Sequence, residues 1–129
     1  MAFRAMTADT SEMRLDGKRA LLVEDDLLVG MSLKASLEQL GAAVTWCNDV
    51  GSAFKALDGR SHHDLAVVDV NLDGEMSSPV LDRLIEMGVY TVISSGYDAS
   101  ALEARFQHLP RCQKPFTRAQ MRRLLTVRH

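Results

Sequence analysis

Long apolar runs are missing from the chain. No segment approaches the roughly 18 consecutive apolar residues that a membrane-spanning helix needs. The first 16 residues also lack the apolar stretch of a signal peptide, and mix Thr, Ser, Asp, Glu and Arg with scattered Met. We therefore expect a protein that does not enter a membrane.

Cysteine is scarce as well. The chain has two, Cys47 and Cys112, and neither belongs to a Cys-x-x-Cys pair. Because that pair is typical of redox and metal-binding motifs, we expect two reduced, buried thiols instead. Together with the missing signal peptide, this predicts a reducing, cytoplasmic setting.

Clustered histidine and excess positive charge are also absent. None of the four histidines has metal-ligand spacing, so we expect His62, His63, His108 and His129 to be exposed to solvent. The net charge is -2, and nucleic-acid binding usually requires a basic face. The 129 residues, 47% of them hydrophobic and 25% charged, suffice for one compact domain with one core.

Strand patterns and helix patterns alternate along the chain. We expect strands at 19–24, 43–47, 64–69, 89–94 and 111–113, and helices at 27–40, 50–57, 76–87, 100–108 and 117–127. Five such units predict an α/β fold, a doubly wound parallel sheet covered by helices on both faces. Residues 1–17 show no sustained period and are expected to form a flexible tail, with the domain spanning 18–129.

The third strand gives the clearest signal. Residues 65–68 are apolar without alternation, as in a strand buried on both sides, and polar residues begin abruptly at Asp69. Glu24 and Asp25 follow the first strand in the same way. Ligands gather at the carboxyl ends of parallel strands, and carboxylates that meet there repel one another unless a hard cation such as Mg²⁺ lies among them. The pattern indicates a metal-assisted phosphoryl acceptor.

Four motifs carry a resemblance to a known family. They are Val23-Glu24-Asp25-Asp26, Val67-Val68-Asp69-Val70-Asn71, Ser94-Ser95-Gly96 and Lys114-Pro115-Phe116. With the motifs in this order, the chain resembles the receiver domain of two-component response regulators over residues 18–127. It is similar to the type of receiver that forms a stand-alone domain. The resemblance implies a flavodoxin-like (βα)5 fold with strand order 2-1-3-4-5, which places Cys47 and Cys112 on opposite edges of the sheet, too far apart for a disulfide.

The resemblance also implies an acceptor and a magnesium site. Asp69 would accept the phosphoryl group, and Mg²⁺ would be held by Asp25, Asp69 and the backbone carbonyl of Asn71. Glu24 would act through a metal-bound water. Asp26 is then left as the N-cap of the first helix.

Two further residues would contact the phosphoryl group. Ser95 would offer its hydroxyl, since the family's Thr or Ser directly precedes a small residue, and Lys114 would offer its ammonium group. The chain also departs from the family, because Arg111 stands where the family usually has the aromatic residue that rotates behind the hydroxyl. Tyr97, two residues after Ser95, could serve instead.

By resemblance the protein is not an enzyme: it receives phosphate on Asp69 from a histidine kinase or phosphotransfer protein and signals through contacts with a downstream protein. A receiver that binds partners without phosphorylation stays open because of Arg111, and so does a weak homodimer. An aspartyl-phosphate phosphatase would need an acid where Asn71 stands. A flavin-binding electron carrier would need a Ser, Thr and Gly loop, whereas Glu24, Asp25 and Asp26 would repel phosphate.

Overall fold

Strands and helices alternate in the computed structural model, which describes residues 14–96, 102–114 and 117–125. In chain order the elements are β1 (Arg19–Val23), α2 (Leu27–Gln39), β2 (Ala43–Cys47), α3 (Val50–Asp58), β3 (Leu65–Asp69), β4 (Asn71–Leu72), β5 (Glu75–Met76), α4 (Ser78–Glu86), β6 (Tyr90–Ser95), the 3-10 turn η2 (Ala104–Phe106), β7 (Arg111–Gln113) and α5 (Arg118–Leu125). Most predicted elements are present, with ends that differ by one or two residues.

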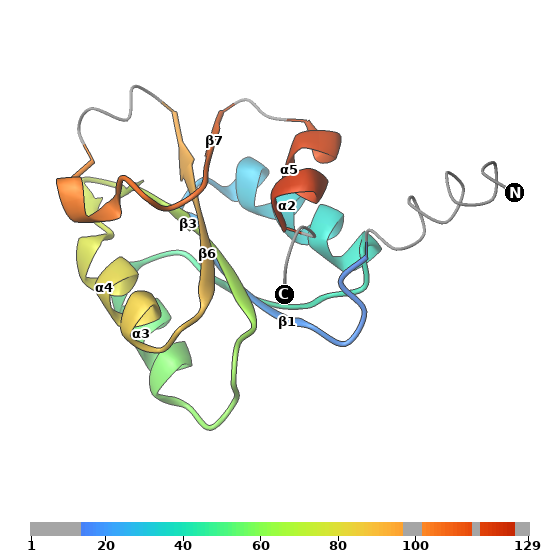
Figure 1. Cartoon of the computed structure of the whole chain (residues 1–129), viewed down its shortest axis with the longest axis horizontal. Helices are drawn as coiled ribbons and strands as arrows, with labels where there is room; N and C mark the ends of the chain where they lie inside the picture. The colour runs from blue at the N-terminus through green and yellow to red at the C-terminus, as the bar shows by residue number, and fades with distance from the viewer. Residues whose placement is uncertain (1–13, 97–101, 115–116, 126–129) are drawn as a thin grey trace, which may run out of the picture.

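The main sheet is parallel, with five strands in the order β2-β1-β3-β6-β7. Helices α2 and α5 cover one face, and α3 and α4 cover the other (Figure 1). This confirms the doubly wound fold and the predicted strand order, since β6 and β7 are the fourth and fifth strands of the main sheet. Cys47 in β2 and Cys112 in β7 are buried free thiols on opposite edges, as predicted.

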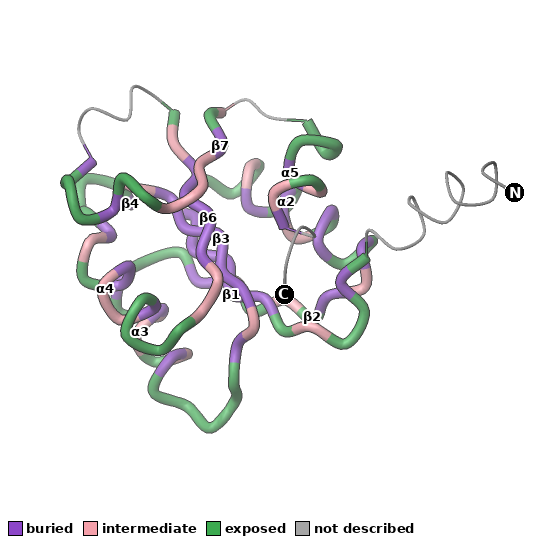
Figure 2. Tube along the Cα trace, in the orientation of Figure 1, coloured by how far each residue is buried: buried purple, intermediate pink, exposed green. Residues whose placement is uncertain are grey.

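Burial explains why β3 lies at the centre. All five of its residues are buried, and Figure 2 shows the inner strands as the most continuously buried part of the chain. A strand that is apolar on both faces has to lie between two layers of helices. One layer of core side chains packs against α3 and α4, and the other against α2 and α5.

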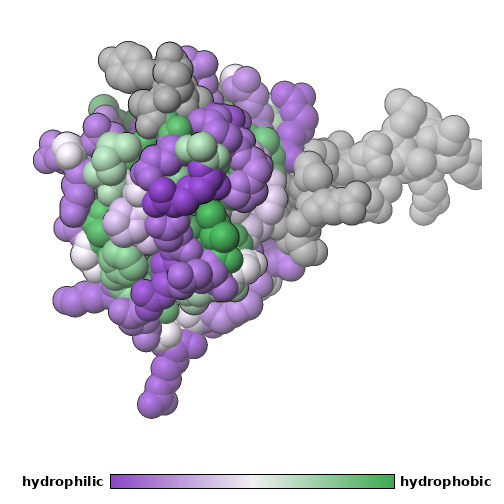
Figure 3. Space-filling view, turned by 60° about the vertical axis from the view of Figure 1, so that its left-hand side comes forward, coloured by the Kyte–Doolittle hydropathy of each residue, from purple (hydrophilic) through white to green (hydrophobic). Residues whose placement is uncertain are grey.

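The face of the molecule on the side of α3 and α4 is mainly polar (Figure 3). Figure 3, which brings the side of α3 and α4 forward, shows hydrophilic side chains with smaller hydrophobic areas between them. No helix in the described ranges has both the length and the apolar character that a membrane crossing requires.

Helix α2 begins and ends as its sequence predicts. Asp26 is the N-cap and accepts a hydrogen bond from the Val29 N–H (3.0 Å), and Gly41 follows the helix with a φ of +105° that favours glycine. The apolar residues of α2 are only partly buried, however, because Leu27 and Met31 are 66% and 55% exposed. These two side chains lie off the stripe of α2 that packs on the sheet.

The segment after Asp69 forms a hairpin that the sequence analysis did not predict. Strands β4 and β5 pair antiparallel, and the turn residues Asp73 and Gly74 have φ values of 51° and 91°. Asp-Gly is a preferred pair for such a turn. The hairpin takes up residues 71–76, so helix α4 begins at Ser78 and not at residue 76 as predicted.

The helix predicted at 100–108 was wrong over its described part. Residues 102–108 contain only the 3-10 turn η2, because Glu103 has an extended backbone (φ -61°, ψ 146°). The Glu103 carboxylate accepts hydrogen bonds from the Ser78 hydroxyl (2.5 Å) and from the Arg105 guanidinium. Residues 100 and 101 lie outside the described residues.

The folded part begins earlier than the predicted boundary at residue 18. Leu15 is fully buried in the layer under α2, and its N–H donates to the carbonyl of Leu40 (2.7 Å). A buried leucine with a paired backbone is part of the core, so the tail cannot extend to residue 17. Residues 1–13 lie outside the described residues.

The prediction that all histidines are exposed was wrong for His63. This residue is 6% exposed, and its Nδ1 has no hydrogen-bond partner in the described part of the chain. Burial lowers the pKa of His63, and the charges of His62 and Arg19 lower it further, against a smaller opposing effect of Asp64. His63 lies two residues before β3, which begins at Leu65.

We expect the contribution of His63 to the stability of the fold to decrease as the pH falls below about 7. The unfolded chain takes up a proton on His63 near its ordinary pKa of about 6.5, whereas the folded chain resists protonation until a lower pH. The free energy of unfolding should therefore fall by at most about 1.4 kcal/mol per pH unit for this group. Urea unfolding of a His63→Leu variant should show a smaller decrease between pH 7 and pH 5 than the parent. A matched His108→Gln variant, at an exposed histidine, should behave as the parent does.

Candidate functional site

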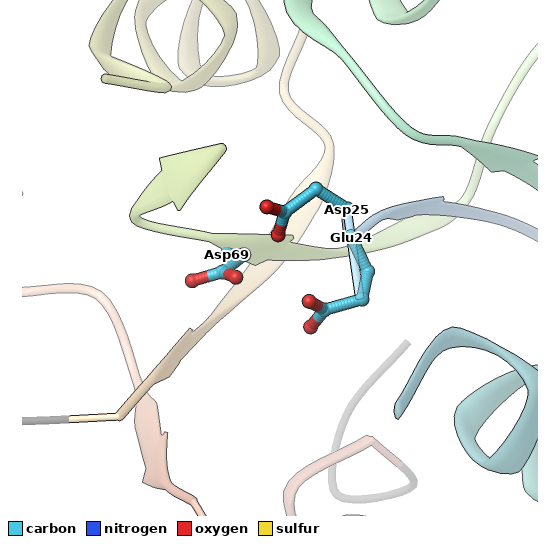
Figure 4. A group of neighbouring side chains, drawn as sticks. All are labelled: Glu24, Asp25 and Asp69. Carbon is cyan, nitrogen blue, oxygen red and sulfur yellow. The ribbon is translucent and has the colours of Figure 1, made fainter. Parts of the chain in front are cut away.

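Three carboxylates meet at the carboxyl end of the sheet. Glu24 and Asp25 follow β1 directly, and Asp69 ends the neighbouring strand β3. Each offers a ligand oxygen within 4.8 Å of the others, and Figure 4 shows the carboxylates turned toward a common space. The parallel register, which pairs Val23 with Val68, places the two strand ends side by side.

Glu24 is the most deeply buried of the three, with 1% of its surface exposed. One carboxylate oxygen lies 2.9 Å from Lys114 Nζ, and the other accepts a hydrogen bond from the Asp26 N–H (3.1 Å). Burial raises the pKa of Glu24 to about 7, although the hydrogen bond from Lys114 acts in the opposite direction, and the nearby Asp69 charge raises it further. The buried acid is therefore held by contacts at both oxygens.

Lys114 joins the acids of the two strands. Its Nζ lies 2.9 Å from Glu24 Oε1 and 3.0 Å from Asp69 Oδ2. The residue follows β7, where its backbone N–H donates to the carbonyl of Ser95 (2.7 Å). Although burial favours the neutral amine, the hydrogen bonds to Glu24 and Asp69 raise the pKa of Lys114 above its ordinary value. The group is therefore a positive charge within the acidic cluster.

The Asp69 carboxylate, at the end of a buried strand, is oriented by contacts at both oxygens. Asp69 is 7% exposed, and while one oxygen accepts from Lys114, the other accepts a long hydrogen bond from the Asn71 N–H (3.4 Å). The side-chain amide of Asn71 turns to the hairpin, where its oxygen accepts from the Gly74 N–H (2.8 Å). Both carboxylate oxygens of Asp69 are therefore in contact with other groups, Lys114 and the Asn71 N–H.

The two serines at the end of β6 differ in their surroundings. Ser94 is fully buried and is paired with Asp69 in the sheet, whereas Ser95 is half-buried and is paired with Gln113 of β7. Successive side chains of a strand point to opposite faces, so the two hydroxyls do not share a face. Ser95 lies next to Lys114 through the backbone bond already described. Tyr97, the other residue singled out in this loop, lies outside the described residues, as do Pro115 and Phe116.

Arg111 lies away from the acidic cluster. Its guanidinium donates to the side-chain oxygen and the backbone carbonyl of Gln107 (3.2 and 3.3 Å), and so connects β7 with the turn after η2. The position where an aromatic residue was expected by resemblance is thus occupied by a cation that bonds to a surface turn.

An open groove of about 590 Å³ runs beside the cluster. It is lined by Asp25, Asn48, Asp49, Leu72, Asp73 and Glu75. The groove leaves the Asp25 side of the cluster open to solvent, while Glu24 and Asp69 are covered. A small anion that approaches Asp69 along this groove passes these negative charges, unless a cation reduces them.

The donor set fits Mg²⁺. The ligands are carboxylate oxygens, with no nitrogen or sulfur ligand among them, and the open side leaves room for the waters that Mg²⁺ keeps. One ammonium group cannot balance three carboxylates. The described residues thus suit a hard divalent cation.

One contact of the site was missed by the sequence analysis. The indole N–H of Trp46 in β2 donates to the backbone carbonyl of Glu24 (2.9 Å). Trp46 is not adjacent to any of the four motifs in the sequence, so only the pairing of β1 with β2 brings it there.

We expect Lys114→Met to destabilise the metal-free protein by about 3 kcal/mol, because it leaves two buried carboxylates without their cation. Urea unfolding at pH 8 in the presence of a chelator measures this loss. The matched variant Lys55→Met, at an exposed lysine of α3, should change the free energy of unfolding by less than about 0.5 kcal/mol. Equal effects of the two variants would show that the contacts of Lys114 contribute nothing to stability.

No family model matches the chain, but curated proteins and solved structures are similar to it. Among curated proteins it is similar to the response regulator protein PmrA of Pseudomonas aeruginosa, with 36% identity over 75 residues, which is 58% of this chain and 34% of PmrA. It is also similar to the transcriptional regulatory protein QseB of Escherichia coli O157:H7, with 30% identity over 91 residues, 70% of this chain and 41% of QseB. The chain thus spans between a third and about two fifths of the length of these relatives.

Solved structures agree over nearly the whole domain. SdrG from Sphingomonas melonis is 33% identical with a TM-score of 0.74, covering 84% of this chain and 92% of SdrG. The receiver domain of the sensor histidine kinase PA1611 from Pseudomonas aeruginosa, which has a magnesium ion in its active-site cleft, is 25% identical with a TM-score of 0.67, covering 84% and 93%. A response regulator receiver protein from Sinorhizobium medicae, 22% identical with a TM-score of 0.77, shares the fold and covers 85% and 92%. These likenesses, the strand order and the acids at the ends of β1 and β3 show that the chain belongs to the receiver domain family of response regulators.

Proposed function

We propose that this protein accepts a phosphoryl group on Asp69, with Mg²⁺ as cofactor, and transmits a signal by contacts with other proteins. The observation that supports this most strongly is the position of Asp69. Its carboxylate ends the central strand, lies 3.0 Å from the Lys114 ammonium group, and belongs to a cluster of three acids within 4.8 Å. A carboxylate is a poor nucleophile toward a negatively charged phosphoryl group. The reaction therefore needs the positive charge of Lys114 and of a cation held by the three acids.

The cation would be held by Asp25, Asp69 and the backbone carbonyl of Asn71, and Glu24 would act through a bound water. When bound, Mg²⁺ reduces the negative charge of the phosphoryl group and aligns donor and acceptor. The deeply buried Glu24 keeps its position through Lys114 and the Asp26 N–H. The chain thereby supplies acids that are already in place before a cation arrives.

The transfer itself uses Asp69 and two neighbours. A carboxylate oxygen of Asp69 forms a bond to phosphorus as the bond to the donor breaks, and the donor leaves with the bonding electrons. Lys114, which contacts Asp69 before the reaction, would then pair with a phosphoryl oxygen, and the Ser95 hydroxyl would donate to another. Both groups stabilise charge and neither has to accept a proton.

We infer that the donor is a histidine kinase or a phosphotransfer protein. The likeness to PmrA and to the receiver domain of the kinase PA1611 supports this donor class. The signal would pass to a downstream protein, and the net charge of -2 speaks against nucleic acid as a direct partner of this domain. We also propose a cytoplasmic location, where such donors present their phosphohistidine.

A second candidate function is partner binding without phosphorylation. It is favoured by Arg111, which bonds to Gln107 where the family usually has a mobile aromatic residue. A phosphatase is less well supported, because the residue two positions after Asp69 is Asn71, whose amide cannot protonate a leaving group.

Acetyl phosphate and Mg²⁺ should add one phosphoryl group to the parent protein, as measured by intact mass. Asp69→Asn should stay unmodified because an amide does not attack phosphorus. Asp16→Asn makes the same chemical change at an exposed acid, whose side chain is 67% exposed, and should be labelled as the parent is. Excess chelator should abolish labelling of every variant.

Labelling of Asp69→Asn to the same extent as the parent would contradict the assignment of the acceptor. A parent that stays unmodified with both reagents, yet still captures a protein partner, would favour the candidate function without phosphorylation.

Mg²⁺ should also stabilise the fold, because it binds the native cluster and the unfolded chain separates the three acids. At a concentration ten times the dissociation constant the gain is about 1.4 kcal/mol, seen as a rise in melting temperature. Asp25→Ala should melt higher than the parent without metal, since one repelling charge is gone, and should gain little when Mg²⁺ is added. A full Mg²⁺ response of this variant would exclude Asp25 as a ligand.

A further inference from the structure

Trp46 bonds to the loop that carries two of the acids. It is the single tryptophan of the chain, and its indole N–H donates to the Glu24 carbonyl (2.9 Å). The ladder between β1 and β2 ends at the pair Val23 and Cys47, and the Glu24 N–H still donates to the Cys47 carbonyl (3.0 Å). Beyond that point the strands offer no further pair, and the indole supplies the donor for the Glu24 carbonyl. Two adjacent residues of β2, Trp46 and Cys47, therefore bind the backbone carbonyl and the backbone N–H of Glu24.

The ring of Trp46 also contacts the start of α2. It lies so close to Gly30 that a methyl group at this position would overlap three atoms of the ring. Gly30 belongs to the first turn of the helix, where its N–H donates to the Asp26 carbonyl (2.8 Å). Glycine is a poor helix former, but at this position the absence of a side chain leaves room for the indole ring.

Asp25 lies between these two points of contact. Its side chain is partly exposed, and within the described part of the chain its carboxylate makes no hydrogen bond or ion pair. Glu24 and Asp69, by contrast, are held through their own carboxylates by Lys114. The direction of the Asp25 carboxylate therefore depends on the backbone between Glu24 and α2.

We propose that Trp46 is a positioning residue for the cation site: by holding the Glu24 carbonyl and the Gly30 turn, it fixes the backbone that aims Asp25 at the cation. The inference rests on the proposed magnesium site. Groups that orient metal ligands change metal affinity when they are lost, even though they do not touch the metal. A ring that only filled space against α2 would contribute to stability and leave the affinity unchanged.

Two variants separate the contacts of Trp46. Trp46→Phe keeps an aromatic ring and removes the N–H, whereas Gly30→Ala keeps the indole and displaces it. The matched control is Gly51→Ala in α3, where an added methyl group has its nearest neighbour, Asp49 Oδ1, at 3.8 Å. Because the two variants disturb the contacts of Trp46 in different ways, either variant alone can test the inference if the other fails to fold.

Isothermal titration of metal-free protein with Mg²⁺ gives the affinity of each folded variant, and urea unfolding in chelator gives its stability separately. We expect about 10-fold weaker Mg²⁺ binding for both Trp46→Phe and Gly30→Ala. Gly51→Ala should bind as the parent does. At saturating Mg²⁺ the rate of labelling by acetyl phosphate should return close to that of the parent, since the reacting groups are intact.

Tryptophan fluorescence provides an independent readout, because Trp46 is the only source of this signal. Mg²⁺ should change the emission of the parent and of Gly51→Ala with the same midpoint that titration gives, and Gly30→Ala should require about 10-fold more Mg²⁺. Lower stability with unchanged Mg²⁺ affinity in both variants would overturn the inference and leave the proposed function intact. A parent that binds no Mg²⁺ would overturn both.

Discussion

The contact of one ammonium group with two buried carboxylates is the interaction on which this site depends. Lys114 lies between Glu24 and Asp69, and without it the burial of both acids would destabilise the fold. The balance is incomplete, because Asp25 adds a third carboxylate at the open side. The three carboxylates therefore leave the site with an excess of negative charge that suits a cation.

The topology of the sheet produces this arrangement from distant parts of the sequence. Strands β1 and β3 are neighbours, so the acids that follow them meet, and Lys114 enters from the end of β7 because its backbone bonds to Ser95 of β6. The edge strand β2 supports the same loop from outside through the Trp46 indole. The proposed acceptor, the proposed cation ligands and their supporting contacts thus come from the ends of all five strands, at one edge of the sheet.

The sequence allowed the inner part of this architecture to be predicted, because burial on both faces leaves a plain pattern. The apolar run that ends at Asp69 marks the central strand, and Asp26 is recognisable as an N-cap by its residue type and place. Contacts between side chains that are far apart in sequence leave no such pattern. The bond from Trp46 to Glu24 and the burial of His63 follow from strand pairing and loop packing, which the local sequence does not encode.

Errors in the predicted helices have a related origin. The segment at 102–108 has apolar residues at helical spacing, yet the Glu103 backbone is extended and its carboxylate contacts Ser78 and Arg105. Leu27 and Met31 fit an apolar stripe by spacing alone, whereas the stripe that packs on the sheet is a different one. In both cases tertiary contacts decided between local alternatives that the sequence pattern left equal.

The most direct test of the account is to locate a divalent cation at the acidic cluster. Anomalous diffraction from crystals grown with Mn²⁺, which accepts the same oxygen ligands as Mg²⁺, shows where the ion binds. We predict one strong peak within bonding distance of Asp25 and Asp69, with Lys114 still in contact with Glu24. A fully occupied peak elsewhere, with none between these carboxylates, would contradict it.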